Sequence, residues 1–102
     1  MAKNTDIVHN NNVGPIVRAG DVALAVAEAA EIDNPDKDVK VLDQTAYLRI
    51  SCDQEMIIRR ETIEECLGKN FEMRELEINM ASFAGQIEGT SDMVRFYFEK
   101  TV

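Results

Sequence analysis

Few side chains in this sequence could carry out chemistry, and they are spaced too far apart to form a site. The 102 residues include one histidine, His9, and two cysteines, Cys52 and Cys66. A structural zinc site needs four clustered Cys or His ligands, and a carboxylate-bridged di-iron site in a helical bundle needs two Glu-x-x-His pairs. The sequence contains neither pattern. We therefore predict that the chain holds no metal.

Motifs that bind organic cofactors or activate nucleophiles are also missing from the sequence. It contains no C-x-x-C pair, no G-x-G-x-x-G, no P-loop and no G-x-S-x-G. His9 follows Met1 to Val8, a segment with little pattern that is expected to be a mobile tail. A lone histidine gives no catalytic constellation. We predict a chain without a cofactor.

Acidic residues remain as candidates for general acid–base catalysis, which needs burial to separate the pKa values of two carboxylates. Glu61, Glu64 and Glu65 are expected on the solvated side of a short helix. Glu75 and Glu77 are expected on one side of a strand, with no apolar residues enclosing them. No nucleophile or cleft accompanies either set. The chain is therefore predicted to be a binding or regulatory component and not an enzyme.

Composition fits a single domain over residues 1–102, large enough to bury one core. No apolar stretch is long enough to span a bilayer and no leader pattern is present, which predicts a cytoplasmic protein. The net charge of −8 disfavours nucleic acid and anionic membranes as partners. It permits docking on a basic protein surface, although it is equally compatible with an acidic protein that has no such partner.

The first half of the chain is predicted to form a strand, a helix and two strands. Val13 to Val17 is short and apolar, and Pro15 is expected to confine this strand to a sheet edge or a strand entrance. Asp21 is expected to cap a helix that ends at Asn34-Pro35, with Leu24 exposed. Its buried face is predicted to carry Val22, Ala25, Val26, Ala29 and Ile32. The two strands are Val39 to Leu42 and Tyr47 to Cys52, the latter with Tyr47, Arg49 and Ser51 facing outward.

The second half is predicted to repeat this order less clearly. Asp53-Gln54 is expected to form a hairpin turn into a strand from Met56 to Arg59. Thr62 and Glu65 match a capping box for a short helix that ends at Gly68. An irregular stretch follows, and then Met93 to Glu99 alternates with Val94, Phe96 and Phe98 inward.

The element order predicts an α+β fold. Two β-α-β-β-like halves would place two helices on a mainly antiparallel sheet, preceded by the mobile N-terminal tail. Cys52 and Cys66 are expected at apolar-face positions as free thiols. Met56, Met73, Met80 and Met93 are scattered in the sequence and are expected to fill gaps in the core.

Two uncharged segments suggest a protein-binding surface. Asn10, Asn11 and Asn12 lead into an apolar run, and Gln86 follows Ser82, Phe83, Ala84 and Gly85. Amides form hydrogen bonds without a large ionic desolvation cost, and Phe83 could anchor in a pocket on a partner. The alternative is that Ile78, Met80 and Phe83 are core and that Gly85 is a turn residue, because aromatic residues dominate cores and interfaces alike.

These segments carry a resemblance to a known family. Four segments resemble the effector (regulatory or coupling) proteins of bacterial multicomponent di-iron monooxygenases, most closely those of toluene and aromatic monooxygenases. They are HNNNVGPIVRAGD from His9 to Asp21, ELEINMASFAGQI from Glu75 to Ile87, AEIDNP and the terminal VRFYFEKTV. The resemblance runs over nearly the whole chain, and the matching positions include Gly14, Pro15 and Asn79 to Gln86.

The resemblance implies a cofactor-free protein that binds the di-iron hydroxylase and couples NADH use and oxygen activation to hydroxylation. It also implies the same α+β fold, indirect partnership with a Rieske ferredoxin and a flavin reductase, and an aromatic substrate. The free protein is expected to be a monomer. The hydroxylase interface is hypothesised at Asn10, Asn11, Asn12, Ser82, Phe83, Ala84, Gly85 and Gln86.

A competing prediction is a small-molecule-binding domain on a ferredoxin-like scaffold, with Tyr47, Arg49 and Arg59 as its polar groups. Such a domain needs a concave apolar pocket on which a few polar groups converge.

Overall fold

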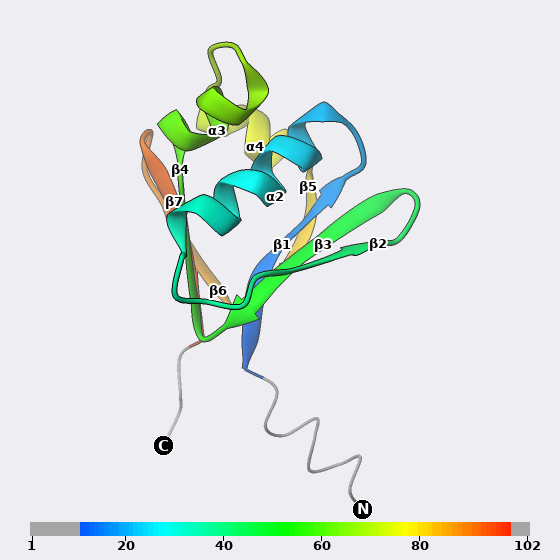
Figure 1. The fold of residues 1–102 in the computed structure, drawn as a ribbon, viewed down its shortest axis with the longest axis vertical. Coiled ribbons are helices and arrows are strands. Elements are labelled where there is room, and N and C mark those ends of the chain that lie inside the picture. The colour runs from blue at the N-terminus through cyan, green and yellow to red at the C-terminus, as the bar shows by residue number, and fades with distance from the viewer. Residues whose placement is uncertain (1–10, 99–102) are drawn as a thin grey trace, which may run out of the picture.

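Three helices pack with two antiparallel sheets in the computed structural model, which describes residues 11–98 (Figure 1). The helices gather at one end, and the β2–β3 hairpin extends away from them. The expected tail at Met1 to Val8, Asn10 and Glu99 lie outside the described residues. The elements are β1 Asn12–Arg18, α2 Asp21–Asp33, β2 Lys40–Asp43, β3 Tyr47–Asp53, β4 Glu55–Arg59, α3 Arg60–Leu67, α4 Met73–Asn79, β5 Met80–Ala84, β6 Gln86–Gly89 and β7 Met93–Tyr97.

The α+β class and the antiparallel pairing are confirmed. One sheet has the order β2-β3-β1-β5 and the other the order β4-β7-β6. The second half of the chain contributes β5 to the first sheet, next to β1, and uses β4, β6 and β7 for its own sheet. The two halves are therefore joined through the pairing of β1 with β5.

Strand β1 lies in the middle of its sheet and Pro15 lies inside the strand, so the prediction of a sheet edge or a strand entrance at Pro15 was wrong. β1 pairs with β3 on one side and with β5 on the other. The ladder with β3 is interrupted at Gly14 and Pro15 and resumes at Ile16. A proline has no N–H to donate, and the sheet accommodates it by omitting these two pairings.

The sharp turn after β3 was predicted correctly, but it does not form a hairpin. β3 pairs with β1 and β2, whereas β4 pairs with β7 in the other sheet. Gln54 has a φ of 71° at the turn. Its N–H donates to the Asn11 carbonyl at 3.0 Å, and its carbonyl accepts from the Phe98 N–H at 2.8 Å. The turn thus ties both ends of the described chain to the junction between the sheets.

Helix α2 ends where it was predicted to end, because the Asn34 side chain forms hydrogen bonds with the neighbouring strand β4. The buried Asn34 side chain donates to the Ala30 carbonyl at 2.7 Å and to the Ile57 carbonyl at 2.8 Å. Its Oδ1 accepts from the Ile57 N–H at 3.0 Å. Leu24 is exposed as expected, but so is Ile32, at 54%. The buried surface of the helix is instead broad and made of small residues, namely Ala23, Ala25, Val26, Ala27, Ala29 and Ala30.

The predicted capping box at Thr62 and Glu65 is not formed. Helix α3 starts earlier, at Arg60, and the Thr62 hydroxyl donates to the Asp33 carboxylate at 2.9 Å. A capping box does exist at the start of α4, between Glu72 and Glu75. Gly68 ends α3 in the left-handed conformation, as predicted.

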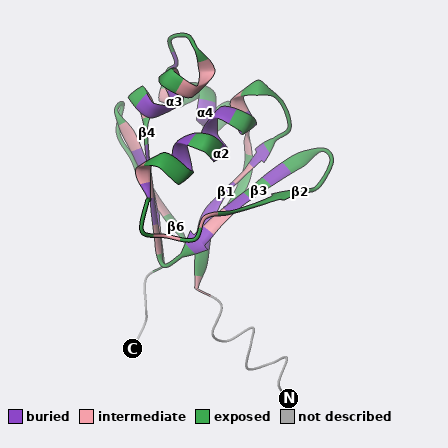
Figure 2. Cartoon of the chain, in the orientation of Figure 1, coloured by how far each residue is buried: buried purple, intermediate pink, exposed green. Residues whose placement is uncertain are grey.

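The irregular stretch expected before Met93 is ordered. It forms α4, β5 and β6, which place Glu75 and Glu77 on a helix and not on a strand. β7 ends at Tyr97, so Phe98, predicted to point inward, is 40% exposed. The core lies between the sheets and under α2, while β2 is exposed along its whole length (Figure 2).

Candidate functional site

The two segments that stood out in the sequence lie side by side. Gly14 of β1 pairs with Ala84 of β5, and Ile16 pairs with Ser82. The register shifts by one residue between Ile16 and Val17, where β5 bulges. Strands β1 and β5, far apart in sequence, are therefore neighbours in one sheet.

Two glycines allow the chain to pack closely around β1. Gly14 has a φ of 141°, and a Cβ there would lie 2.1 Å from the Ile50 carbonyl oxygen. Gly85 has a φ of 90°, and a Cβ there would lie 2.6 Å from Cγ1 of Val13. Both backbone angles are rarely adopted by residues with a side chain, and no side chain fits in the space. Gly85 is thus a turn residue, as the alternative prediction for this segment stated.

One face of the four-stranded sheet is open. In the antiparallel register, Leu42, Arg49, Ile16 and Ser82 lie opposite one another in a single row across β2, β3, β1 and β5. Directly paired residues point to the same side of a sheet. The opposite side, with Val17, Leu48 and Ile50, is buried. We call the side with Leu42, Arg49, Ile16 and Ser82 the outer face.

The outer face receives three of the predicted site residues. By register it carries Asn12, Ser82 and Ala84, of which Asn12 and Ser82 are exposed and Ala84 is half-buried. Asn11 precedes β1 and is half-buried.

The remaining predicted residues lie elsewhere. Phe83 pairs with Pro15 and points to the inner side at the open edge of the sheet, where its ring centroid lies 6.1 Å from that of Phe96. It is 40% exposed, while Phe96 is fully buried. Gln86 begins β6 and pairs with Tyr97, on the outer side of the three-stranded sheet. The structure therefore does not bring Gln86 onto the outer face with Ser82 and Ala84.

Ile78 was expected in the core under the alternative prediction for this segment, and it is not. It is 67% exposed near the end of α4, directly before β5. With Phe83, it leaves two large apolar side chains accessible around the exposed edge strand.

The groups proposed for a small-molecule site do not converge. Tyr47 and Arg49 lie on the outer face, whereas Arg59 pairs with Met93 in the other sheet. The hollow beside Arg49, lined also by Asn12, Gly14 and Ser51, measures about 80 Å³. Ligand pockets commonly measure about 300–1,000 Å³. The geometry does not favour the competing prediction.

A second surface was missed in the sequence. Met73, Met80 and Met93 are half-buried and line one groove between α4 and the β6–β7 hairpin, of about 460 Å³. Among the four methionines expected to fill gaps in the core, Met56 alone is fully buried. The signal was present, because Met73, Leu76 and Met80 have the i, i+3, i+7 spacing of one helical face. It was obscured because this stretch was expected to be irregular.

Within residues 11–98 no group of three or more His, Cys, Asp or Glu side chains could hold a metal ion. Cys52 and Cys66 are free thiols in the described chain. Burial raises the pKa of the Cys52 thiol, and burial together with the Glu28 carboxylate raises the pKa of Cys66. A raised pKa leaves little thiolate at neutral pH, so neither sulfur is an activated nucleophile. None of the described helices is long and apolar enough to cross a membrane.

The chain is similar to known monooxygenase components. The effector subunit of the alkene monooxygenase system of Xanthobacter autotrophicus strain Py2 is 38% identical over 94 residues, which cover 92% of this chain and 93% of that protein. The stimulatory component DmpM of phenol 2-monooxygenase from Pseudomonas sp. strain CF600 is 34% identical over 79 residues, covering 78% and 83%.

The fold has solved counterparts. A chain in the structure of the phenol hydroxylase–regulatory protein complex superposes with a TM-score of 0.74 at 32% identity, covering 86% of this chain and 99% of that chain. The family match spans residues 11–97. The names of the relatives, an effector subunit and a stimulatory component, confirm the resemblance to effector proteins that the sequence suggested. This chain belongs to the MmoB/DmpM family.

Proposed function

We propose that this chain is the effector protein of a multicomponent monooxygenase, acting as one domain in the cytoplasm. It binds the hydroxylase component, carries no cofactor itself, and tunes active-site access, oxygen activation and the coupling of NADH use to hydroxylation. Related proteins of this family are named as effector or stimulatory components, and a similar chain occurs in a hydroxylase–regulatory protein complex. The ferredoxin and reductase of the system are indirect partners.

The observation that carries the proposed binding role is the pairing of β1 with β5. It joins two segments of uncharged polar and small residues into one exposed surface, with Asn12 and Ser82 on it. Small side chains allow close approach of a partner backbone, and uncharged polar groups can form hydrogen bonds with it without desolvating a charge. We propose that the hydroxylase covers this surface and the exposed edge at Phe83.

The substrate class has two candidates, because one relative belongs to an alkene system and another to a phenol system. We propose an aromatic substrate on the basis of the sequence resemblance, with an alkene as the second candidate. The hydroxylase partner, and not this chain, would select the substrate, since Tyr47, Arg49 and Arg59 do not converge on one pocket and the hollow beside Arg49 measures only about 80 Å³.

The function is tested by titrating this protein into purified hydroxylase, ferredoxin and reductase of a toluene-type system, and in parallel into those of an alkene system. The measurement is product formed per NADH consumed. We expect saturating stimulation near one effector per active site, with improved coupling, in one of the two systems. If turnover and coupling stay flat with a cognate hydroxylase that responds to its own effector, the proposed function is wrong. A thermal-shift screen would then test the small-molecule alternative, since a specific ligand raises Tm by mass action.

The binding surface is tested by Ser82→Arg. Ser82 is exposed on the outer face, so a long charged side chain there should obstruct docking and leave Tm nearly unchanged. The matched control is Ser91→Arg, because Ser91 is also exposed but lies in the loop between β6 and β7. We expect Ser82→Arg alone to raise the Kd for the hydroxylase. Equal affinities for the two variants would place the binding surface elsewhere.

A further inference from the structure

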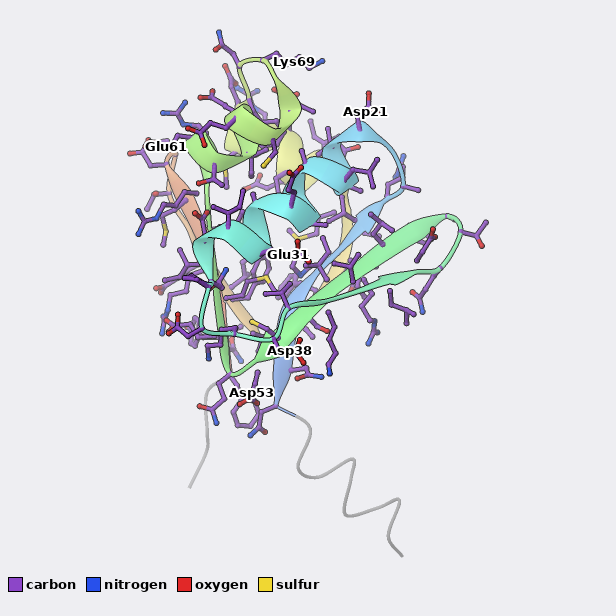
Figure 3. The ribbon with its side chains drawn as sticks, viewed as in Figure 1. Asp21, Glu31, Asp38, Asp53, Glu61 and Lys69 are labelled. Carbon is purple, nitrogen blue, oxygen red and sulfur yellow. The ribbon has the colours of Figure 1, made fainter. Side chains whose placement is uncertain are left out.

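The outer face has the opposite charge to the rest of the molecule. The three helices contain nine acidic and two basic residues and so carry a net charge of −7. Asp21, Glu31 and Glu61 project from them into solvent (Figure 3). By register, the outer face carries three basic residues, Arg18, Arg49 and Lys40, and one acidic residue, Asp53. A chain of net charge −8 therefore has one positively charged sheet face.

Arg49 is at the centre of this face. It lies on β3 with Leu42 of β2 directly opposite on one side and Ile16 of β1 directly opposite on the other. Tyr47, two residues away on the same face, is 39% exposed and Leu42 is 54% exposed. Arg49 thus has apolar residues as its cross-strand neighbours and lines the small hollow at Gly14.

No described residue forms an ion pair or hydrogen bond with the Arg49 or Arg18 side chain. Lys40 is paired with Asp38 at 3.3 Å, but both groups are exposed. A strand in the middle of a sheet is a rigid support, so binding does not have to order the backbone that carries Arg49. Arginine and tyrosine surrounded by apolar contacts are the composition of an interface hot spot.

We propose that the outer face docks on an acidic patch of the hydroxylase, with Arg49 bound to a carboxylate and Leu42, Ile16 and Tyr47 packed around that contact. This inference rests on the proposed function and extends the surface from β1 and β5 to β2 and β3. A guanidinium can bind a carboxylate through two parallel hydrogen bonds, and the apolar surroundings exclude water from them. The charge of the whole chain would suggest a basic partner, but the local charge of this face selects an acidic one.

The acidic helices contribute to orientation. Charges more than about 8 Å apart in physiological salt are largely screened from each other. In a docked complex, the charges of the partner therefore interact mainly with those of the face nearest to them. An acidic patch attracts the outer face and repels the helices, which disfavours docking in the reverse orientation. Electrostatic complementarity of this kind gives specificity more than raw affinity.

The test measures the Kd for the cognate hydroxylase by calorimetry, together with product formed per NADH. Arg49→Glu should raise Kd at least about tenfold, because it places a carboxylate against a carboxylate at a hot spot. Arg49→Gln, which keeps most of the stem, should raise Kd less. The matched control is Arg59→Glu, since the Arg59 side chain is also exposed on a strand and pairs with no described side chain, but lies on the other sheet. It should leave Kd within about twofold of wild type.

The outcomes separate the two proposals. If wild type stimulates turnover and Arg49→Glu binds as tightly as Arg59→Glu, the docking face is wrong and the proposed function stands. If both variants weaken binding equally, net charge and not this face controls affinity, which also overturns the inference. If wild type neither binds nor stimulates, both proposals fail. The Tm of each variant shows whether it is folded. If Arg49→Glu does not fold, the Kd of Arg49→Gln tests the docking face instead.

Discussion

Arg95 of β7 and Arg49 of β3 occupy corresponding places on the two sheets. Each lies on a strand with a neighbour on both sides and points outward. Arg95 donates to the carboxylates of Glu55 and, at 3.0 Å, of Glu88, and its guanidinium carbon lies 4.1 Å from the centre of the Tyr97 ring. These partners raise the pKa of Arg95 further above its ordinary value. Arg49 has no such partner among the described residues.

The difference separates a charge used within the fold from a charge left for a partner. On the three-stranded sheet, the neighbouring strands β4 and β6 supply carboxylates that neutralise the arginine. On the four-stranded sheet, the neighbours of the arginine are Leu42 and Ile16, which cannot. An arginine between aliphatic neighbours retains its full capacity to bind an external carboxylate.

The largest expected effect comes from breaking the sheet that supports the outer face. Gly14→Ala would place a methyl group 2.1 Å from the Ile50 carbonyl oxygen at a φ of 141°. Backbone strain and overpacking should together lower the free energy of unfolding by at least about 3 kcal/mol. Urea denaturation measures this change.

Gly89→Ala is the control, because Gly89 lies on the three-stranded sheet and the nearest atom to an added Cβ there is 3.5 Å away. It should change stability by no more than about 1 kcal/mol. Equal losses for the two variants would contradict the close approach of β1 to β3 at Gly14.

Local features of the fold were easier to predict from the sequence than contacts between distant segments. The outward positions of Tyr47 and Arg49 follow from the alternation along one strand, and the end of α2 follows from Asn34-Pro35. Those are local patterns. The pairing of β1 with β5 is not local, because it joins residues about 70 positions apart. The sequence could indicate that both segments were unusual, but not that they were adjacent.

The errors have a common cause, which is that tertiary contacts override local signals. Pro15 indicated an edge strand or a strand entrance, but β1 is central, and its ladder with β3 omits the pairings of Gly14 and Pro15. Thr62 indicated a helix cap, but its hydroxyl is bound by Asp33 of another helix. Gln86 looked continuous with Ser82, yet Gly85 turns the chain onto the other sheet.

A second prediction concerns Phe83, which lies between the two regions. Phe83→Ala should lower the free energy of unfolding by about 1–2 kcal/mol, because its ring is only partly buried against Phe96. Phe96→Ala, at a fully buried position, should cost about 3–5 kcal/mol. Chemical denaturation ranks the two. Phe83→Ala should in addition weaken hydroxylase binding when compared at a temperature where it is fully folded. A loss as large as that of Phe96→Ala, with unchanged affinity, would make Phe83 a core residue.

The smallest expected effects test the comparison of the two arginines directly. Arg95→Gln should lower Tm slightly, because Glu55 and Glu88 lose their shared cation, and the loss should shrink in about 0.5 M salt, where exposed ion pairs are screened. It should leave hydroxylase affinity unchanged.

Arg49→Gln should have the opposite pattern, with Tm unchanged and hydroxylase affinity reduced, since no described group loses a partner. The decisive result is that Arg95→Gln changes Tm but not hydroxylase affinity, whereas Arg49→Gln changes affinity but not Tm. If Arg49→Gln lowered Tm as much as Arg95→Gln, Arg49 would be a structural residue like its counterpart, and the outer face would have no free charge to offer a partner.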